Sequence, residues 1–123
     1  MAVWIDHQEA RIFHVDVQNF DEKTVAHAHR HSKGGGNKIE NHPDDDHRFF
    51  RDVAHQLAGA EQVLVLGPGV TKAQFSRYAS ENDPALASQI VGVEDADHPT
   101  DKQIVAHVRH HFHIDPPRRT PDV

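Results

Sequence analysis

A glycine-rich segment with basic neighbours is the part of the sequence best suited to contacting a nucleic acid. Three consecutive glycines destabilise helix and strand alike, so they predict a loop. Glycine also lets backbone N–H groups approach a crowded surface closely, and nearby cations would contact phosphates without reading base sequence. The alternative is a disordered surface loop without a partner. The residues predicted to bind RNA are Arg30, His31, Lys33, Gly34, Gly35, Gly36, Asn37 and Lys38.

Acidic residues follow two of the apolar runs. Asp6 follows the first run, and Glu94, Asp95 and Asp97 follow the last. Metal-dependent nucleases hold two metal ions with carboxylates of this kind at strand ends, which makes Asp6 a catalytic candidate. The alternative is local structure, in which Asp6 holds the first turn and Asp97 caps the last helix.

The chain contains 13 histidines and no cysteine. His27, His29 and His31 would lie on one side of a strand, and His107 and His111 on one helix face. Such spacings can build a zinc site, but no thiolate and no His-x-x-x-His motif with a glutamate base accompanies them. Solvent-facing polar residues are the simpler interpretation, so we expect no metal site and no cofactor.

Gly67-Pro68-Gly69 stands between a continuous apolar run and a predicted helix. A helix N-terminus at this place could cradle a phosphate. The segment lacks the spacing of a Walker A loop, so a tight strand-to-helix turn is the favoured interpretation.

Periodicity predicts the elements that must position these residues. Alternating apolar and polar residues predict strands, and the apolar stripes predict three helices. The strands are expected at residues 3–5, 10–17, 24–30, 62–66 and 90–93. The first helix begins near 44–46, with Gly59 as its C-cap. Thr71 is expected to cap the second, which ends at 82–84, and Pro99 stands in the first turn of the third.

The order β-β-β-α-β-α-β-α predicts an α/β fold with a ribonuclease-H-like mixed sheet and helices on both faces. We expect a single domain over residues 1–113 and a flexible C-terminal tail over 114–123.

Composition restricts the class of protein further. The chain has 123 residues and a formal charge of −6, so any RNA contact must come from a local patch on an acidic domain. The sequence has neither a signal-peptide pattern nor an apolar run that could span a membrane, so a cytoplasmic location is expected.

The strand–GPG–helix segment carries a family resemblance. Residues 63–69, with Lys72 and Phe75 after them, resemble the middle domain of Pelota and of the archaeal–eukaryotic class I release factors. Asp6 and residues 91–94 fit the same pattern, and the resemblance covers roughly residues 2–113. The chain is also similar to small single-domain bacterial proteins described as translational machinery proteins.

The resemblance implies a role for the glycine-rich segment. In the release factors the corresponding loop carries Gly-Gly-Gln and triggers hydrolysis of peptidyl-tRNA on the ribosome. Here either Gly36 or Asn37 stands in place of the glutamine, depending on the alignment. Pelota also lacks the glutamine and does not hydrolyse peptidyl-tRNA, so we expect no hydrolysis here either.

Three hypotheses follow. The leading one is a non-enzymatic module that binds the ribosome or tRNA in rescue, stress or hibernation. The second is a weak hydrolase, acting on peptidyl-tRNA through Asn37 or on nucleic acid through a metal ion and Asp6. The third is a protein-interaction domain without an RNA role, which forms a homodimer through its sheet or a helix face.

Overall fold

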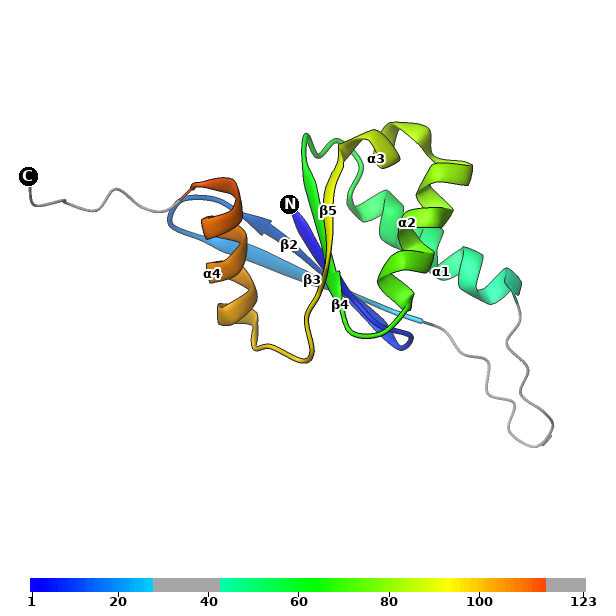
Figure 1. Cartoon of the computed structure of the whole chain (residues 1–123), viewed down its shortest axis with the longest axis horizontal. Coiled ribbons are helices and arrows are strands. Elements are labelled where there is room, and N and C mark those ends of the chain that lie inside the picture. Colours follow the sequence, from blue (N-terminus) through cyan, green and yellow to red (C-terminus); the bar gives the residue numbers. More distant parts are fainter. Residues whose placement is uncertain (28–42, 115–123) are drawn as a thin grey trace, which may run out of the picture.

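A five-stranded mixed sheet forms the centre of the molecule (Figure 1). The computed structural model describes residues 1–27 and 43–114. The strands are β1 (Ala2–Ile5), β2 (Glu9–Val15), β3 (Phe20–Ala26), β4 (Val63–Gly67) and β5 (Ile90–Asp95). The helices are α1 (Pro43–Gln56), α2 (Thr71–Asn82), α3 (Pro84–Gln89) and α4 (Asp101–Phe112).

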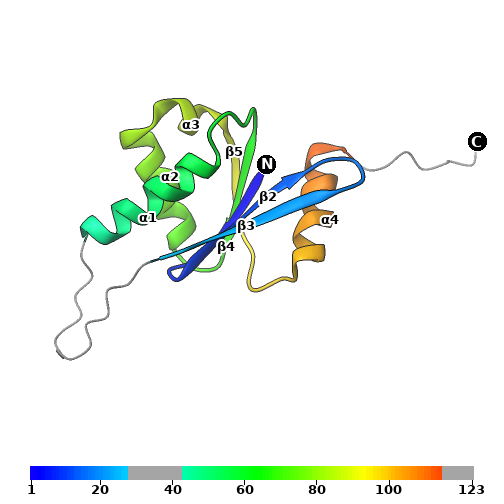
Figure 2. The same cartoon turned by 180° about the vertical axis from the view of Figure 1, so that it is seen from behind.

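The strand order in the sheet is β3-β2-β1-β4-β5. The first three strands form an antiparallel meander, and β4 and β5 lie parallel to β1. In Figures 1 and 2, helices α1, α2 and α3 cover one face of the sheet and α4 covers the other. The predicted mixed sheet with helices on both faces is thereby confirmed.

Two apolar clusters, one on each face, hold the helices to the sheet. Val3 and Val65 belong to the cluster under α1 and α2, whereas Trp4 and Leu64 belong to the cluster under α4. Every residue of β1 and β4 is buried, because these central strands have helices on both sides. This burial explains the continuous apolar run at residues 63–66.

The structure adds one helix that the sequence analysis missed. The break predicted at residues 82–84 separates α2 from the short helix α3. The side chain of Asp83 accepts a hydrogen bond from the backbone N–H of Leu86 at 3.2 Å, and Pro84 stands in the first turn. A capping residue followed by proline starts a helix as readily as it ends one.

Several predicted boundaries were wrong. Strand β3 begins at Phe20 because Asp16 forms the preceding turn, accepting hydrogen bonds from the N–H groups of Gln18 and Asn19. Helix α4 begins at Asp101, since Thr100 forms a capping box with Gln103. Pro99 therefore precedes the helix.

Helix α2 also differs from its predicted form. Val70 occupies the N-cap position without a side-chain cap, so Thr71 is the first helical residue. Ala73 is exposed, whereas Lys72 is buried. None of the helices in the described residues is long and apolar enough to cross a membrane.

Candidate functional site

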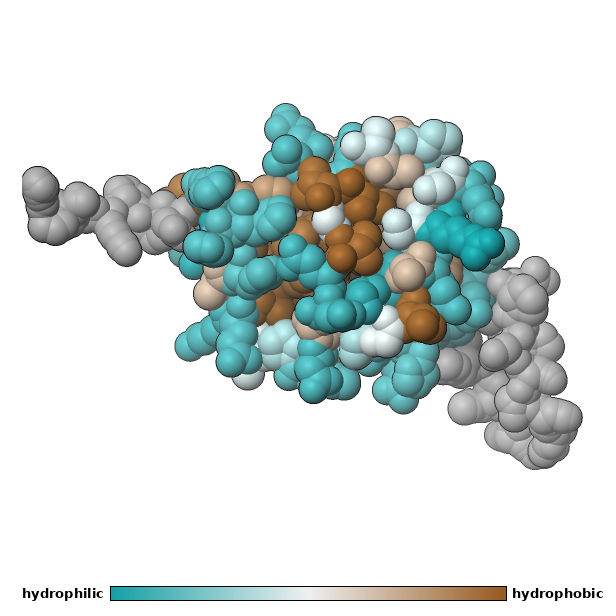
Figure 3. All heavy atoms as spheres, viewed as in Figure 1, coloured by the Kyte–Doolittle hydropathy of each residue, from teal (hydrophilic) through white to brown (hydrophobic). Residues whose placement is uncertain are grey.

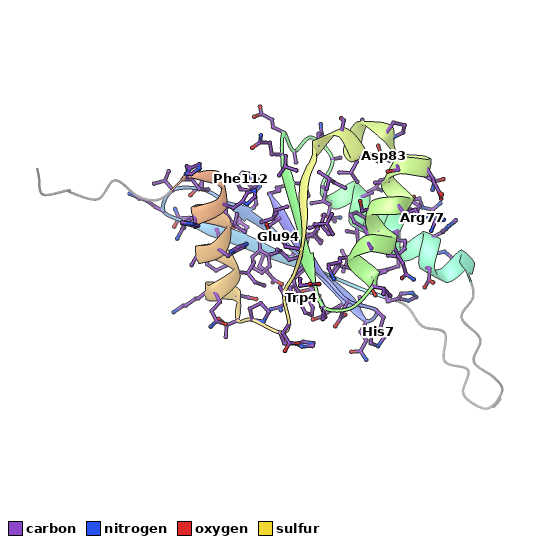
Figure 4. All side chains as sticks on the ribbon, viewed as in Figure 1. Trp4, His7, Arg77, Asp83, Glu94 and Phe112 are labelled. Atoms are coloured by element: carbon purple, nitrogen blue, oxygen red, sulfur yellow. The ribbon has the colours of Figure 1, made fainter. Side chains whose placement is uncertain are left out.

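Several of the described residues considered for function lie at one end of the sheet. Strands β1, β3, β4 and β5 run in the same direction, so their carboxyl ends lie together. We call this end, with Asp6, His27, residues 67–69 and Asp95, the carboxyl end of the sheet. Figure 4 shows His7 at this end, far from Phe112 at the end of α4.

The predicted RNA-binding residues follow β3 at the carboxyl end. Residues 30–38, with Asn37 among them, lie outside the described part of the chain. The residues on either side of that segment are described. They show where it leaves the sheet and where α1 begins.

His27 joins the two sides of this segment. Its Nε2 lies 2.8 Å from Oδ1 of Asp46 in α1, and its ring centroid lies 4.7 Å from that of Phe49. The backbone N–H of His27 donates to the carbonyl of Gln8 at 2.9 Å. The side chain is 6% exposed. The end of β3 is therefore fixed to both the first turn and the first helix.

The Gly67-Pro68-Gly69 turn is shaped by steric and backbone requirements. A Cβ atom at position 67 would lie 2.1 Å from the carbonyl oxygen of Ile5 in the neighbouring strand, so only glycine fits there. Gly69 has a φ of +64°, a conformation that glycine adopts without strain. These geometries agree with the favoured interpretation of a tight strand-to-helix turn.

Lys72 connects this turn to the end of β5. Its ammonium group donates to the carbonyl of Gly69 and lies 2.6 Å from Oδ1 of Asp95. Lys72 is the buried charged residue of the described chain, at 9% exposure. Phe75, one helical turn later, packs in the core against Phe50 with ring centroids 5.7 Å apart. The lysine and phenylalanine that carry the resemblance thus hold the turn and the core.

Asp6 holds the first turn. Its Oδ1 accepts hydrogen bonds from the N–H groups of Gln8 and Glu9 at 2.8 and 2.9 Å. Its Oδ2 lies 3.9 Å from Nε2 of His98. These contacts agree with the interpretation that Asp6 holds the first turn.

The other three carboxylates do not join Asp6. Glu94 lies 2.8 Å from Nε2 of His107 on α4, and Asp95 pairs with Lys72. Asp97 lies 3.2 Å from Nδ1 of His98 and does not cap α4. Within residues 1–27 and 43–114, no group of three metal-ligating side chains could hold a metal ion.

The histidines are divided between several places. His107 and His111 share a face of α4, as predicted, and both approach Glu94; Nδ1 of His111 lies 3.8 Å from Oε2. His27 points to α1. His29 and His31 lie outside the described residues.

The exposed face of α1 carries basic residues that the sequence analysis did not single out. Arg48 and Arg51 are exposed, one turn apart, and neither forms an ion pair with a described residue. Phe49, Phe50 and Val53 define the buried face of the same helix. The signal was available, because these arginines occupy the polar positions of the apolar pattern that predicted α1.

Several known proteins are similar to this chain in sequence and in fold. No protein-family model matches the chain. It is 34% identical over 101 residues to the Pelota homologue of Thermococcus gammatolerans, covering 77% of this chain and 27% of that protein. It is 35% identical over 68 residues to the homologue of Pyrococcus horikoshii, covering 50% of this chain and 19% of that protein. The chain thus spans about a fifth to a quarter of these relatives.

Solved Pelota structures have the same fold. The structure of Archaeoglobus fulgidus Pelota matches 90% of this chain and 34% of that one, with a TM-score of 0.60 and 18% identity. Thermoplasma acidophilum Pelota matches 89% of this chain and 31% of that one, with a TM-score of 0.61 and 21% identity. The sheet, the GPG turn and these matches define a mixed α/β domain with the fold found in solved Pelota structures. More particularly, the chain is a Pelota-like domain, as its sequence predicted.

Proposed function

We propose that this domain is a binding module of the translation apparatus, which contacts the ribosome or a tRNA in the cytoplasm during rescue, stress or hibernation. The observation that carries the proposal is its 34% identity to a Pelota homologue over 101 residues. Because the chain spans about a quarter of that relative, the proposal concerns binding by this domain alone.

The proposed contact is made by residues 30–38. His27 precedes this segment and Asp46 in α1 follows it, and their side chains contact each other. This contact holds together the two places where the segment joins the fold. Fixed ends lower the entropic cost of binding, because the segment loses fewer backbone conformations when it binds. The basic residues Arg30, Lys33 and Lys38 would then supply contacts to phosphates.

Arg48 and Arg51 extend this contact onto α1. Both are exposed, and α1 begins where residues 28–42 end. Neither arginine forms an ion pair with a described residue, so each can meet a phosphate without breaking such a pair. Arginine suits this role because its planar guanidinium group can bind a phosphate through two hydrogen bonds.

The domain binds without hydrolysing peptidyl-tRNA in this account. Asn37 is one methylene shorter than the glutamine of the release factors, and Gly36 offers no side chain at all. Nucleic-acid cleavage through Asp6 has little support, because its Oδ1 already accepts two backbone hydrogen bonds in the first turn.

Binding to purified ribosomes and to tRNA across a range of salt concentrations tests the proposal. Lys33→Ala combined with Lys38→Ala should weaken binding and reduce the salt slope by about two charges' worth. Arg48→Ala combined with Arg51→Ala should do the same. The control is Arg77→Ala on α2, an exposed arginine paired with Glu81 at 3.4 Å, which should leave binding unchanged. Equal losses in all three variants would contradict a localised contact.

Release of labelled peptide from peptidyl-tRNA separates binding from hydrolysis. The wild-type domain should bind ribosomes without releasing peptide, and Asn37→Ala should bind equally well. Release by the wild-type domain that disappears in Asn37→Ala would support the hydrolase hypothesis instead.

A further inference from the structure

Among the described residues, strand β5 is an edge of the sheet with an apolar surface. It pairs with β4 on one side, and it is the last strand in the sheet order. Val91 and Val93 are 44% and 39% exposed. Figure 3 shows apolar surface in the middle of this face, where β5 runs between α4 and α2 in Figure 1.

The opposite edge of the sheet has a different character. Strand β3 carries Asp21, Glu22 and Lys23 in succession. Charged residues on an edge strand oppose pairing with another strand, because pairing would bury them. Residues 90–93 of β5 contain neither a charge nor a proline, and an edge strand always presents unpaired backbone donors and acceptors. Of the two edges, β5 is therefore the one suited to accept a further strand.

We propose that two copies of this chain associate through β5, with the two β5 strands antiparallel about a twofold axis at Gly92. In this arrangement Val91 lies opposite Val93 of the second copy, on the same face of the joined sheet. Gly92, at the axis, adds no side chain between the strands. A twofold interface uses the same surface on both copies, and the Val-Gly-Val sequence reads the same in both directions.

The charges of β5 favour a second copy in this orientation. Glu94 and Asp95 both lie at the carboxyl end of the strand. Antiparallel pairing places them opposite Ile90 and Gln89 of the second copy, so that like charges do not meet. Glu94 is also bonded to His107, and Asp95 to Lys72, within each copy.

The association should be weak and should strengthen with salt. The apolar surface comprises two half-exposed valines in each copy, and each copy carries a formal charge of −6. Salt screens this repulsion between copies, so the dimer fraction should rise with ionic strength. Binding to RNA through residues 30–38 would instead weaken as ionic strength rises, so the salt dependence distinguishes the two interactions.

Sedimentation velocity of the full chain over a range of concentrations tests the proposal. The wild-type chain should show a concentration-dependent dimer. Val93→Lys should remove it, because a lysine on the edge would be buried on pairing. Val70→Lys is the control, since Val70 is 66% exposed and lies outside β5. A chain that stays monomeric at its solubility limit, or a dimer that persists in Val93→Lys, would overturn the proposal.

Cysteine cross-linking tests the orientation, since the chain has no cysteine of its own. A mixture of Val91→Cys and Val93→Cys chains should form more disulfide-linked dimer than either variant alone. Directly opposed residues of an antiparallel pair lie within disulfide distance, whereas diagonal ones lie farther apart. Equal cross-linking in the mixture and in the separate variants would overturn pairing about Gly92.

Discussion

Gly67 ends β4 beside the backbone of β1, and its lack of a side chain makes this approach possible. In Gly67→Ala the new Cβ would lie 2.1 Å from the carbonyl oxygen of Ile5, so the strands must separate. We expect a loss of about 1–3 kcal/mol in the free energy of unfolding, as for other overpacked sites. Chemical denaturation measures this loss.

Gly69→Ala provides the comparison for that prediction. A Cβ at position 69 would meet no atom within 4 Å, so its cost arises from the φ of +64° alone. This strain costs about 1–2 kcal/mol. A larger loss in Gly69→Ala than in Gly67→Ala would contradict the steric account of the turn.

Single residues show where sequence reasoning succeeds and where it fails. Asp6 was expected to hold the first turn, and it does, because its side chain reaches backbone N–H groups two and three residues away. Asp97 was expected to cap α4, but Thr100 caps it. Thr100 and Gln103 have the spacing of a capping box, in which each side chain bonds to the backbone N–H of the other residue. The burial of Lys72 in α2 was not predictable from spacing, because it depends on a contact with Asp95 at the end of β5.

Among the elements, β4 should contribute most to stability, since all five of its residues are buried. Leu64 and Leu66 pack under α4. Leu64→Ala or Leu66→Ala should lower the free energy of unfolding by about 2–5 kcal/mol, because each leaves a cavity. Thermal or chemical denaturation checks the value.

Val17→Ala, in the turn between β2 and β3, is the control for β4. Val17 is 39% exposed, so its truncation removes little packing and should change the denaturation midpoint only slightly. Unchanged midpoints in both leucine variants would show that β4 is not the centre of the fold.

Elements with strong periodicity were predictable, and short ones were not. The apolar run at 63–66 predicted β4, and the alternation around Ile12 and Phe13 predicted β2. Ile12 and Phe13 are both buried, each in the apolar cluster of a different face of the sheet. Helix α3 spans six residues, fewer than two turns, so it is too short to show an apolar stripe at helical spacing. The start of β3 was misplaced because the turn at Asp16 depends on hydrogen bonds rather than hydropathy.

The charge of the whole molecule should depend strongly on pH. The chain has a formal charge of −6 with neutral histidines, 13 histidines and a pI of about 6.1. Because histidine gains a proton between pH 8 and about 5, the net charge passes through zero in this range. Solubility should be lowest near the pI, where repulsion between molecules vanishes.

Solubility measured from pH 5 to 8 tests this prediction. A minimum near the pI is expected. A flat profile would indicate that most histidines keep the same protonation state throughout, and it would contradict the charge account.

At the scale of the molecule, the fold was predictable and the functional surface was so only in part. The order of elements and the residues around Gly67 predicted a Pelota-like domain. Both could be recognised in the sequence, since periodicity gives the order of elements and the close approach of β4 to Ile5 requires a glycine at position 67. The sequence did not predict which residues meet at the carboxyl end of the sheet. The contact between His27 and Asp46, for example, is visible only in the three-dimensional structure. The predicted RNA-binding residues lie outside the described part, so their role stays a prediction.

The central claim is that this domain contacts the ribosome or tRNA through residues 30–38. Co-sedimentation with ribosomes in sucrose gradients, from growing and from stationary cells, tests it most directly. The wild-type chain should sediment with ribosomal particles at low salt and be released as salt increases, and Lys33→Ala with Lys38→Ala should remain near the top of the gradient. If the wild-type chain does not sediment with ribosomes and does not bind tRNA at low salt, the claim is contradicted.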